Sequence, residues 1–517
     1  MLTTRRRVLQ VDADMLEDQQ QILSGGGKKS YKFCRFAVIF VSFYANLVLF
    51  GKLYSISLLV NELLKPPCFA GGDDDGINTT TKLTTDNETV KTTGSEGNDT
   101  RGCGGFGAGR GPTAWTGSVL LSAYFLSSAF AGALSDKFGR RKTAVVGALV
   151  TACSTIASSF VHNLLPFVLL FSVGGGFGIG LVDITTISTL QVYHPKHFSQ
   201  IMGVATSGTG IGILTFGLTY SMMLNAFGWR WTIRLFGLLV SLLVLFCLTY
   251  GSGESNVDKN TRVEVKEEKD PDTISYVVAI QNGTTLEGGG PSGAPGAANN
   301  RDVNETVPLK RKSSIDWELL RNPYVLAIGL GRSLGFFGYS ISLVHMVSLA
   351  QDLTKSEHQS SLVVILYGVG ELIGRFSAGW IGQWKKTNRF YLLQGGIFLL
   401  GVSTIAASAI SNLPALLTHA CAIGILSGSA VTLDSVALRD FVGAERMTQA
   451  TGFTMAFRSP FTLLAPPIAG WIFDATESYE SAFYVGGSVS ILGALLYLVV
   501  PLVQHQRKNK IKPISSK

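Results

Sequence analysis

The chain has 517 residues, a formal net charge of +8 at pH 7 and only 15% charged residues. Soluble domains typically carry about 25% charged residues, so the composition argues against a soluble enzyme. Six cysteines without a CxxC pair are too few for a disulfide scaffold and argue against a common zinc motif. Long apolar runs separate the basic residues, which argues against nucleic acid as a partner.

Apolar runs of membrane-spanning length dominate the chain outside three polar stretches, at 1–32, 65–112 and 251–322. A spanning helix needs about 20 apolar residues, or about 30 with its loop, so we expect about twelve spans. We predict the first six at 34–60, 113–135, 143–161, 164–190, 200–225 and 230–250. We predict the second six at 323–350, 360–383, 390–410, 413–438, 447–473 and 480–503. The expected fold is an all-α integral membrane protein with twelve transmembrane helices in two six-helix halves.

These two sets of spans define the domain organisation. The first half covers 33–250 and the second covers 323–503, with short tails at 1–32 and 504–517. The segment 251–322 between the halves is rich in Gly, Pro, Asn and charge, which predicts a disordered linker.

Basic residues gather on one side of the predicted membrane. They lie in the N-terminal tail, in the loops after the second and eighth spans, and in the C-terminal tail. Because cytoplasmic loops carry an excess of Lys and Arg, both termini and the linker are predicted to be cytoplasmic. The loop 65–112 is then extracellular, and its sequons predict glycosylation at Asn78, Asn87 and Asn98. Cys68 and Cys103 bracket this loop, and either a disulfide or two free thiols would fit the sequence.

A charged motif follows the second span. It consists of Gly132, Asp136, Lys137, Gly139, Arg140 and Arg141, in the spacing G-x-x-x-D-[RK]-x-G-[RK]-[RK]. The glycines permit close helix approach and a tight turn, and Asp136 stands where it can pair with basic residues and latch two helices. This motif resembles the signature of the major facilitator superfamily. A degraded copy after the eighth span, with Gln383 in place of the acid, supports two related halves.

Several segments resemble the monocarboxylate transporter family of that superfamily. The most specific similarity lies within 413–490, where 440–443 and 464–483 are similar to the family's D-L-V-G and L-G-P-P-I-A-G stretches. The resemblance implies a plasma-membrane carrier of small monocarboxylates that works by alternating access, with proton symport as the first expectation. Members of the family often need a single-pass immunoglobulin-like partner to reach the surface, and the sequence leaves open whether this chain does.

The first span departs from the family pattern. The family's D-G-G-W-G-W opening is absent at 31–36, and Tyr54 stands where proton-coupled members carry a Lys. Lys52 lies two residues earlier, about 200° around an α-helix. These departures favour an alternative, which is proton-independent facilitated transport of aromatic amino acids or related carboxylate-bearing solutes. A rival from another class is a transporter-fold receptor that senses a ligand without net flux.

Ionisable residues inside the predicted spans are candidate functional residues, because such groups are costly in hydrocarbon unless they face a cavity or a partner. Glu371 and Arg375 lie four residues apart on one face of the eighth span. The family has D-x-x-x-R there, and the resemblance implies that Arg375 binds the substrate carboxylate while Glu371 helps to carry the proton. The alternative is a static ion pair that fixes helix packing.

The remaining candidates are spread over five other spans. Those for substrate binding are Lys52, Tyr54, His345 and Arg458, and those for proton coupling are Asp183 and Asp434. The sequence does not choose between Lys52 and Arg458 as partners for either aspartate. Arg234 and Arg332 lie nearer to helix ends and are interpreted as structural.

A glycine-rich stretch at 174–180 is predicted to be a helix-packing surface rather than a nucleotide loop, because it lacks a preceding strand and a Lys-Ser/Thr pair. No Ser-His-Asp set, metal cluster or ATPase motif is apparent in the sequence. We therefore expect a transporter rather than an enzyme, with no metal and no cofactor. Its expected partners are a small organic acid, a proton and the lipid bilayer.

Overall fold

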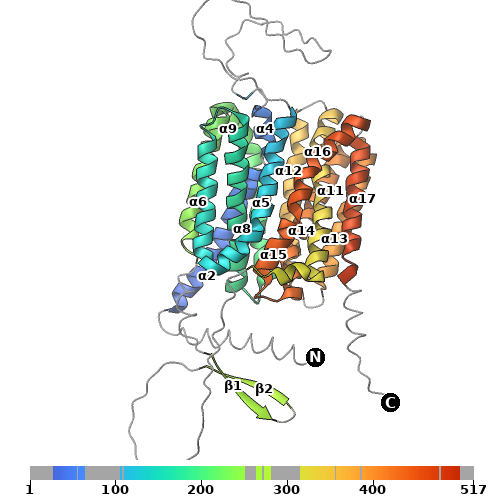
Figure 1. Cartoon of the computed structure of the whole chain (residues 1–517). Coiled ribbons are helices and arrows are strands. Elements are labelled where there is room, and N and C mark those ends of the chain that lie inside the picture. The colour runs from blue at the N-terminus through green and yellow to red at the C-terminus, as the bar shows by residue number, and fades with distance from the viewer. Residues whose placement is uncertain are drawn as a thin grey trace, which may run out of the picture.

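The computed structural model describes residues 27–54, 56–63, 105–106, 110–250, 263–270, 273–280, 315–354, 357–384, 387–476 and 479–500. Helices in these ranges form an antiparallel bundle of twelve rods (Figure 1). Eight of the described helices are long and apolar enough to cross a membrane. The predicted all-α membrane fold is therefore confirmed.

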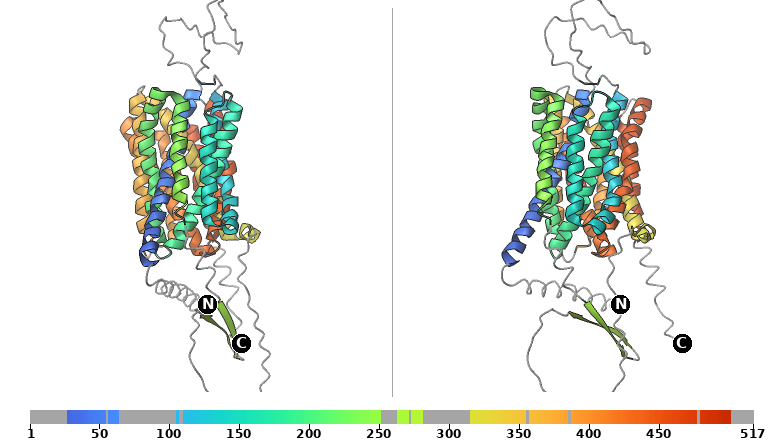
Figure 2. Two further views of the ribbon diagram at one scale, coloured as in Figure 1. Left: turned by 90° about the vertical axis from the view of Figure 1, so that its left-hand side faces the viewer. Right: turned by 60° about the vertical axis from the view of Figure 1, so that its left-hand side comes forward.

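The first half of the bundle begins with a rod built from several helical pieces. This rod consists of α2 (Gly27–Ala45), the π-helix η1 (Asn46–Phe50), α3 (Gly51–Tyr54) and α4 (Ile56–Leu63). The next rods are α5 (Arg110–Phe138) and α6 (Arg140–Ser158), then α7 (Leu164–Phe167), the π-helix η3 (Val168–Gly174) and α8 (Gly175–Tyr193) as one rod. Figure 2 shows α2 extending beyond the end of the bundle.

One long element, α9 (Phe198–Cys247), contains the fifth and sixth predicted spans. The chain reverses within it at Gly228, whose φ of 73° is the left-handed region that glycine adopts without strain. The sequence prediction of two helices separated by a short turn is therefore correct, although the turn is reduced to this break.

The second half follows the same plan. It comprises η4 (Trp317–Arg321), α11 (Pro323–Thr354), α12 (Glu357–Ile381), α13 (Arg389–Ala406), η5 (Ala407–Ala409), α14 (Leu413–Val442), α15 (Met447–Ala456), α16 (Arg458–Thr476) and α17 (Tyr479–Leu496). The single helix predicted at 447–473 is divided into α15 and α16. The division lies just before Pro460, whose ring cannot sit in a regular helix interior without disturbing the preceding turn.

The segment between the halves contains two strands that the sequence analysis did not predict. Strands β1 (Val263–Asp270) and β2 (Thr273–Ile280) pair antiparallel, from Val263 opposite Ile280 to Asp270 opposite Thr273. In Figure 1 this hairpin lies away from the helical bundle.

Glycines bring the helices of the first half close together. A Cβ on Gly178 of α8 would lie 2.5 Å from the carbonyl oxygen of Gly147 in α6. A Cβ on Gly180 would lie 2.5 Å from the carbonyl oxygen of Tyr124 in α5. Because small residues allow membrane helices to approach at this distance, α8 fits between α5 and α6. The glycine-rich stretch is thus a packing surface, as predicted.

The two halves meet mainly along three pairs of helices. Helix α9 packs against α12, and α5 packs against α15 and α16. Each half has buried apolar clusters of its own, formed in the first half mainly by residues between Val38 and Tyr250. The second half contains three separate clusters. Polar groups can therefore lie at the interface between the halves without disrupting the apolar core of either half.

Candidate functional site

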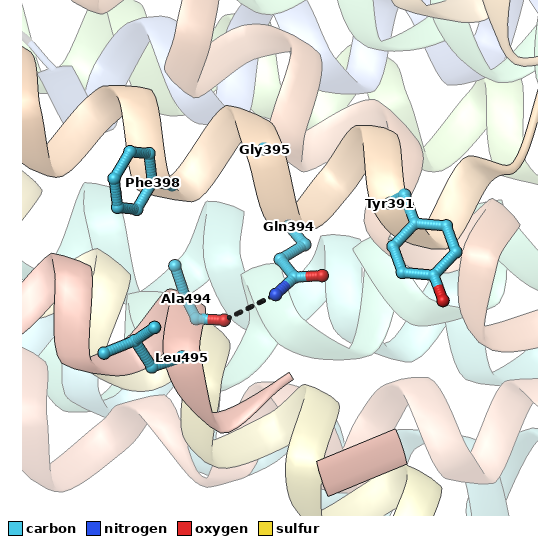
Figure 3. Close-up of a pocket in the computed structure, with 6 residues that line it drawn as sticks. All are labelled: Tyr391, Gln394, Gly395, Phe398, Ala494 and Leu495. Atoms are coloured by element: carbon cyan, nitrogen blue, oxygen red, sulfur yellow. Dashed lines mark hydrogen bonds between the residues drawn. The ribbon is translucent and has the colours of Figure 1, made fainter. Parts of the chain in front are cut away.

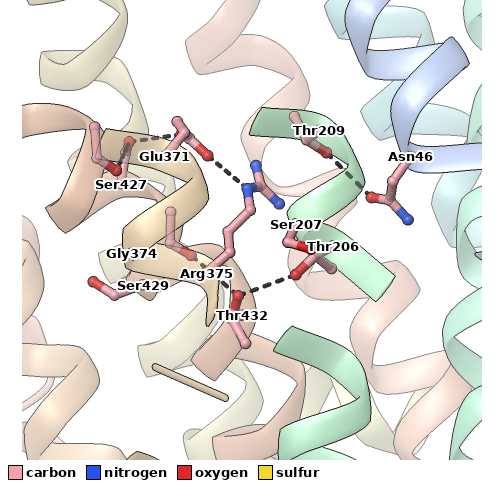
Figure 4. Close-up of polar contacts among 12 residues, drawn as sticks. Asn46, Thr206, Ser207, Thr209, Glu371, Gly374, Arg375, Ser427, Ser429 and Thr432 are labelled. Carbon is pink, nitrogen blue, oxygen red and sulfur yellow. Dashed lines mark hydrogen bonds and ion pairs between the residues drawn. The ribbon is translucent and has the colours of Figure 1, made fainter. Parts of the chain in front are cut away.

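A buried ion pair lies on α12 at the interface between the halves. The Nε of Arg375 donates to the Oε2 of Glu371 at 2.6 Å, and these side chains are 4% and 1% exposed. Their spacing of one helical turn places both on the same face of α12. The pairing expected from the sequence is therefore present (Figure 4).

The other oxygen of Glu371 is also occupied. Its Oε1 accepts hydrogen bonds from the Tyr367 hydroxyl at 2.8 Å and from the Ser427 hydroxyl of α14 at 2.7 Å. The Tyr339 hydroxyl of α11 in turn bonds to that of Tyr367. Three donors thus hold the Glu371 carboxylate, so its orientation, and that of Arg375, is fixed by several helices.

Hydroxyl groups from the first half face this pair. In Figure 4 the Arg375 side chain points toward α9, where Thr206, Ser207 and Thr209 lie. Thr206 bonds to Thr432 of α14 across the interface at 3.2 Å. Arg375 therefore sits where groups from both halves can reach one ligand.

A second ion pair joins α14 to α16. Arg458 bonds to the Oδ2 of Asp434, and both side chains are buried. The Arg458 guanidinium also lies 5.8 Å from the ring centre of Phe125 in α5, and the adjacent Ser459 bonds to Ser122 at 2.8 Å. The structure thus chooses Arg458 as the partner of Asp434, and it places this pair beside the first half.

The third candidate acid, Asp183 of α8, has a different environment. Its Oδ2 accepts a hydrogen bond from the Tyr124 hydroxyl at 2.8 Å. Asp183 forms no ion pair within the described residues, although Arg375 and Arg458 both lie within electrostatic range of it. It is therefore the candidate acid whose charge is not directly paired.

Lys52 is buried in the interior of the first half. Its side chain is 3% exposed, its Nζ donates to the Thr155 hydroxyl of α6 at 2.6 Å, and Nζ lies 4.2 Å from the ring centre of Phe171. Neither Asp183 nor Asp434 is its ion-pair partner. The alternatives that paired Lys52 with one of these acids are therefore wrong.

Some predicted residues lie outside the description. The side chains of Tyr54 in α3 and His345 in α11 are not described. The predicted glycosylation sites and the bracketing cysteines also lie outside the described residues; they are Asn78, Asn87, Asn98, Cys68 and Cys103. Their roles stay predictions.

One buried charge lies deeper in the bundle than the sequence analysis expected. Arg332 was interpreted as structural because it lies toward the start of its span, yet it ranks among the largest fully buried side chains. It is the tenth residue of α11 (Pro323–Thr354), which places it about 14 Å along the helix axis. That depth, about half a membrane thickness, was the signal that could have identified it.

The motif after the second span links the halves. Asp136 accepts a hydrogen bond from the Gln449 amide of α15 at 2.9 Å, and a Cβ on Gly132 would lie 3.0 Å from the Cα of Gln449. The latch is therefore formed with a neutral amide of the other half rather than with the expected basic residue. Gly139 has a φ of 90° and begins the turn to α6.

The two arginines of this motif behave differently. Arg140 donates to the Ser188 hydroxyl of α8 at 3.0 Å. Arg141 is exposed. Of the two arginines, Arg140 is the one that ties the motif to a neighbouring helix through a described contact.

The degraded copy of the motif forms a matching link between α12 and α9. Gln383 donates to the carbonyl oxygen of Lys196 at 2.8 Å, and Ser199 donates to that of Gly379 at 2.9 Å. A Cβ on Gly203 would lie 2.8 Å from the Cα of Gly379. Both copies thus join the halves at the face where α2 begins (Figure 1).

A histidine outside the spans connects α2 with the turn after α8. The Arg35 guanidinium bonds to Nδ1 of His194 at 3.2 Å, and Nε2 of His194 lies 3.3 Å from the Arg35 carbonyl oxygen. Burial lowers the pKa of His194 below its ordinary value of 6.5; the hydrogen bond to the Arg35 carbonyl oxygen opposes this shift, and the charges of Arg35 and His197 add to it. The fold therefore favours the neutral ring.

None of the buried charged residues lines either of the two described hollows. One hollow of about 220 Å³ is lined by residues of α13 and α17, where Gln394 donates to the carbonyl oxygen of Ala494 at 3.2 Å (Figure 3). A second, of about 290 Å³, lies among α12, α13 and α14. No group of three His, Cys, Asp or Glu in the described part of the chain is placed to hold a metal ion.

Comparisons with known proteins agree with this architecture. The profile of the Major Facilitator Superfamily matches residues 104–459 and 328–516. Human monocarboxylate transporter 10 is 24% identical over 407 residues, covering 78% of this chain and 72% of that protein. Human monocarboxylate transporter 14 is 25% identical over 452 residues, covering 79% of this chain and 86% of that protein.

Among solved structures, the crystal structure of the human organic anion transporter MFSD10 is similar, with a TM-score of 0.59 and 13% identity. The similarity covers 90% of this chain and 99% of that one. At this identity the likeness concerns the fold.

Proposed function

The chain belongs to the Major Facilitator Superfamily and is a secondary transporter related to the monocarboxylate transporters rather than an enzyme, and from this premise we propose that it carries small monocarboxylates together with a proton across the plasma membrane. The observation that carries the proposal is the buried Glu371–Arg375 pair on α12. A guanidinium keeps its charge and presents a planar fork of donors that matches a carboxylate.

The surroundings of Arg375 support its role as the carboxylate anchor. Glu371 is held by Tyr367, Ser427 and Arg375 itself, so it orients the guanidinium through Nε. The side chain points toward α9 of the opposite half. A ligand bound there would touch both halves, which is what coupling to their relative movement requires.

Asp183 is our first choice for the proton-binding group. Glu371 and Asp434 each share their charge with an arginine, whereas Asp183 is bonded by the neutral Tyr124 hydroxyl. When Asp183 loses its proton, its negative charge is attracted by Arg375 and Arg458. When it gains a proton, one buried charge is removed. Its protonation can therefore respond to whether an anion occupies the site.

Alternating access would require the contacts that each motif copy makes with the opposite half to break. The Asp136–Gln449 and Gln383–Lys196 contacts close the face where α2 begins, and we propose that this face is cytoplasmic because it also carries the basic loops. The loop 65–112 would then be extracellular and glycosylated. Candidates outside these steps are Lys52, Tyr54 and His345, which we keep as secondary substrate contacts.

Cytoplasmic pH in expressing cells tests the proposal. We expect pulses of lactate, pyruvate or 3-hydroxybutyrate to acidify the cytoplasm faster than in cells expressing Arg375→Lys, because lysine cannot reproduce the bidentate fork. The matched control is Arg389→Lys, which alters an arginine bonded to Asp440 at 2.8 Å outside the site. Surface biotinylation, with and without a co-expressed single-pass immunoglobulin-like protein, confirms delivery.

The same assay separates the rival functions. Entry of a labelled aromatic amino acid through an Arg375-dependent route without acidification would favour facilitated, proton-independent transport. Binding of a carboxylate without uptake or counterflow would favour a receptor. Normal acidification by the Arg375→Lys variant would reject Arg375 as the anchor.

A further inference from the structure

The last residues of the segment between the halves pack against the second half. These residues, 315–321, are called the linker end below, and they include η4 (Trp317–Arg321). Leu319 is 1% exposed and belongs to an apolar cluster of the second half. The Trp317 ring centre lies 6.3 Å from that of Phe453 in α15. The linker end is therefore docked on the bundle beside α15.

Two acidic residues of the linker end lie near the start of α15. The Nε of Arg446 lies 3.6 Å from the Oδ2 of Asp316, and its Nη1 lies 3.8 Å from the Oε2 of Glu318. The Oδ1 of Asp316 accepts a hydrogen bond from the Glu318 N–H at 3.2 Å and caps η4. The side chains of Arg446 and Glu318 are more than half exposed, and ion pairs this exposed are individually weak. They do not by themselves fix the linker end.

A more buried contact joins the linker end to the latch. The backbone N–H of Asp316 donates to the Oε1 of Gln449 at 2.9 Å, and Gln449 is 8% exposed. The Nε2 of the same amide donates to the Oδ2 of Asp136 in the first half at 2.9 Å. One glutamine side chain of α15 thus contacts both the linker end and the motif after the second span.

The two partners of Gln449 require the same orientation of its amide. A carboxylate only accepts hydrogen bonds, so Asp136 requires the NH₂ group of Gln449. A backbone N–H only donates, so Asp316 requires the amide oxygen. Turning the amide by half a revolution would place two acceptors together at Asp136 and two donors together at Asp316. The linker end therefore holds the amide in the orientation that the latch uses.

We infer that Asp316 is a positioning residue of the latch, which acts through its backbone N–H on Gln449. With the linker end docked, Gln449 presents its NH₂ group to Asp136 and stabilises closure of the face where α2 begins. With the linker end displaced, the amide loses this constraint and the latch is weaker. This inference rests on the proposed function, in which that face opens during transport, and it adds the linker end to the parts that control the opening.

Proline substitution isolates the backbone donor. The φ of Asp316 is −82°, close to the value of about −65° that a proline ring imposes, and proline has no N–H. Asp316→Pro therefore removes the hydrogen bond to Gln449 together with the carboxylate. Asp316→Ala is the matched control, because it removes the same carboxylate, with its cap of η4 and its contact with Arg446, and keeps the N–H.

A cysteine beside the latch measures its opening. Ser135 precedes Asp136 in α5 and is 1% exposed, and its hydroxyl has no hydrogen-bond partner among the described residues, so Ser135→Cys is a mild change. We compare the rates at which a water-soluble thiol reagent modifies this cysteine in the full-length protein in detergent. Protein that keeps Ser135 gives the background from the native cysteines. We expect Asp316→Pro to react about twofold to tenfold faster than Asp316→Ala, a range that corresponds to the net free energy of one hydrogen bond.

Gln449→Leu tests whether the N–H acts through this side chain. Leucine has no hydrogen-bonding group, so both amide contacts are lost. In this background we expect Asp316→Pro and Asp316→Ala to react at equal rates, whereas a general disturbance of η4 by proline would persist. Leu319→Ala, which truncates the buried side chain of the linker end, is a second variant. It should also speed the reaction when Gln449 is present and not when it is replaced.

The outcomes separate this inference from the proposed function. Equal rates for Asp316→Pro and Asp316→Ala with Gln449 present overturn the inference, and so does a difference that persists in Gln449→Leu. If size-exclusion chromatography shows that Asp316→Pro is not folded, an unchanged rate in Leu319→Ala overturns it instead. The labelling needs no substrate. Absence of lactate-driven acidification by the wild-type protein therefore overturns the proposed substrate and not the role of Asp316.

Discussion

The two halves of this transporter treat most of their buried charge in opposite ways, with Arg332 of the second half as the exception. In the second half, Glu371 with Arg375 and Asp434 with Arg458 form ion pairs between side chains of opposite charge. In the first half, Lys52 and Asp183 are buried apart, and neutral hydroxyl groups of Thr155 and Tyr124 are their hydrogen-bond partners.

This difference separates two roles, which are to hold donors in a rigid arrangement and to respond to an incoming anion or proton. Paired charges fix each other, so the second half holds a rigid arrangement of donors. Charges bonded to hydroxyl groups keep their response to an incoming anion or proton, because no opposite charge in contact cancels them. The comparison predicts that substitutions of the same kind will have unequal effects in the two halves.

Neutralising one aspartate in each half should give the largest difference. Asp434→Asn leaves Arg458 buried without a counter-charge, which we expect to lower the free energy of unfolding by about 3–5 kcal/mol. Asp183→Asn leaves no ion pair broken and keeps an oxygen for Tyr124, so we expect a loss of about 1 kcal/mol or less. Thermal unfolding in detergent measures both. Equal melting temperatures would contradict the comparison.

Overpacking the interface between the halves should give the next largest effect. Gly203→Ala would place a methyl group against Gly379 and the Arg375 carbonyl oxygen, each 2.8 Å away, and overpacking of this kind costs about 1–3 kcal/mol. We expect the latched face to open, which cysteine labelling at that face measures. Gly395→Ala is the control, since nothing lies within 4 Å of its Cβ. Equal labelling of the two variants would show that Gly203 is not a closure contact.

Removing one hydroxyl group from each half tests the same difference between the halves with smaller expected losses of stability. Thr155→Val takes away the hydroxyl acceptor of Lys52, which we expect to cost about 1–3 kcal/mol. Ser427→Ala leaves Glu371 with Tyr367 and Arg375, so about 0.5–1.5 kcal/mol is expected. Melting temperatures of the two variants decide the order. A larger loss in Ser427→Ala would mean that the paired charges are the more fragile ones.

Acidification should produce the smallest effect, at the contact between α2 and the turn after α8. His194 has a lowered pKa in the fold, so the unfolded chain binds more protons, and the stability it contributes is full above pH 6.5 and falls as the pH drops below that value. The corresponding contact of the second half joins Arg389 to Asp440 and contains no histidine.

Hydrogen exchange of α2 at pH 7.5 and pH 5.5 measures this effect, after correction for the intrinsic rate. We expect faster exchange at the lower pH in the wild-type protein and no such change in His194→Gln, whose amide does not titrate. Faster exchange around Arg389 and not in α2 would place the pH sensitivity in the second half and contradict this prediction.

Much of the fold could be predicted because it depends on local composition. Apolar runs of spanning length gave the number and order of the rods, and the motif around Asp136 predicted a latch. The glycine-rich stretch was correctly interpreted because spacing alone decides helix packing. These features need no knowledge of which helix faces which.

The charged contacts could not be predicted, because they depend on how each helix is rotated and tilted. Asp136 bonds to Gln449, a residue 313 positions away, instead of to a nearby basic group. Asp434 could have paired with Lys52 or Arg458, and its partner in the structure is Arg458, the first residue of α16. Arg332 was dismissed from its place in the chain, although depth in the membrane was the better guide.

The π-helical turn at Asn46–Phe50, immediately before Lys52, has a consequence for comparing this protein with its relatives. A π turn holds one residue more than an α turn, because its hydrogen bonds run from i to i+5. Residues on either side of it are therefore out of step with a regular helix, and counting 100° per residue from Phe33 misplaces Lys52 and Tyr54. A first span that is a regular α-helix throughout would therefore match this one only with a one-residue gap within Asn46–Phe50.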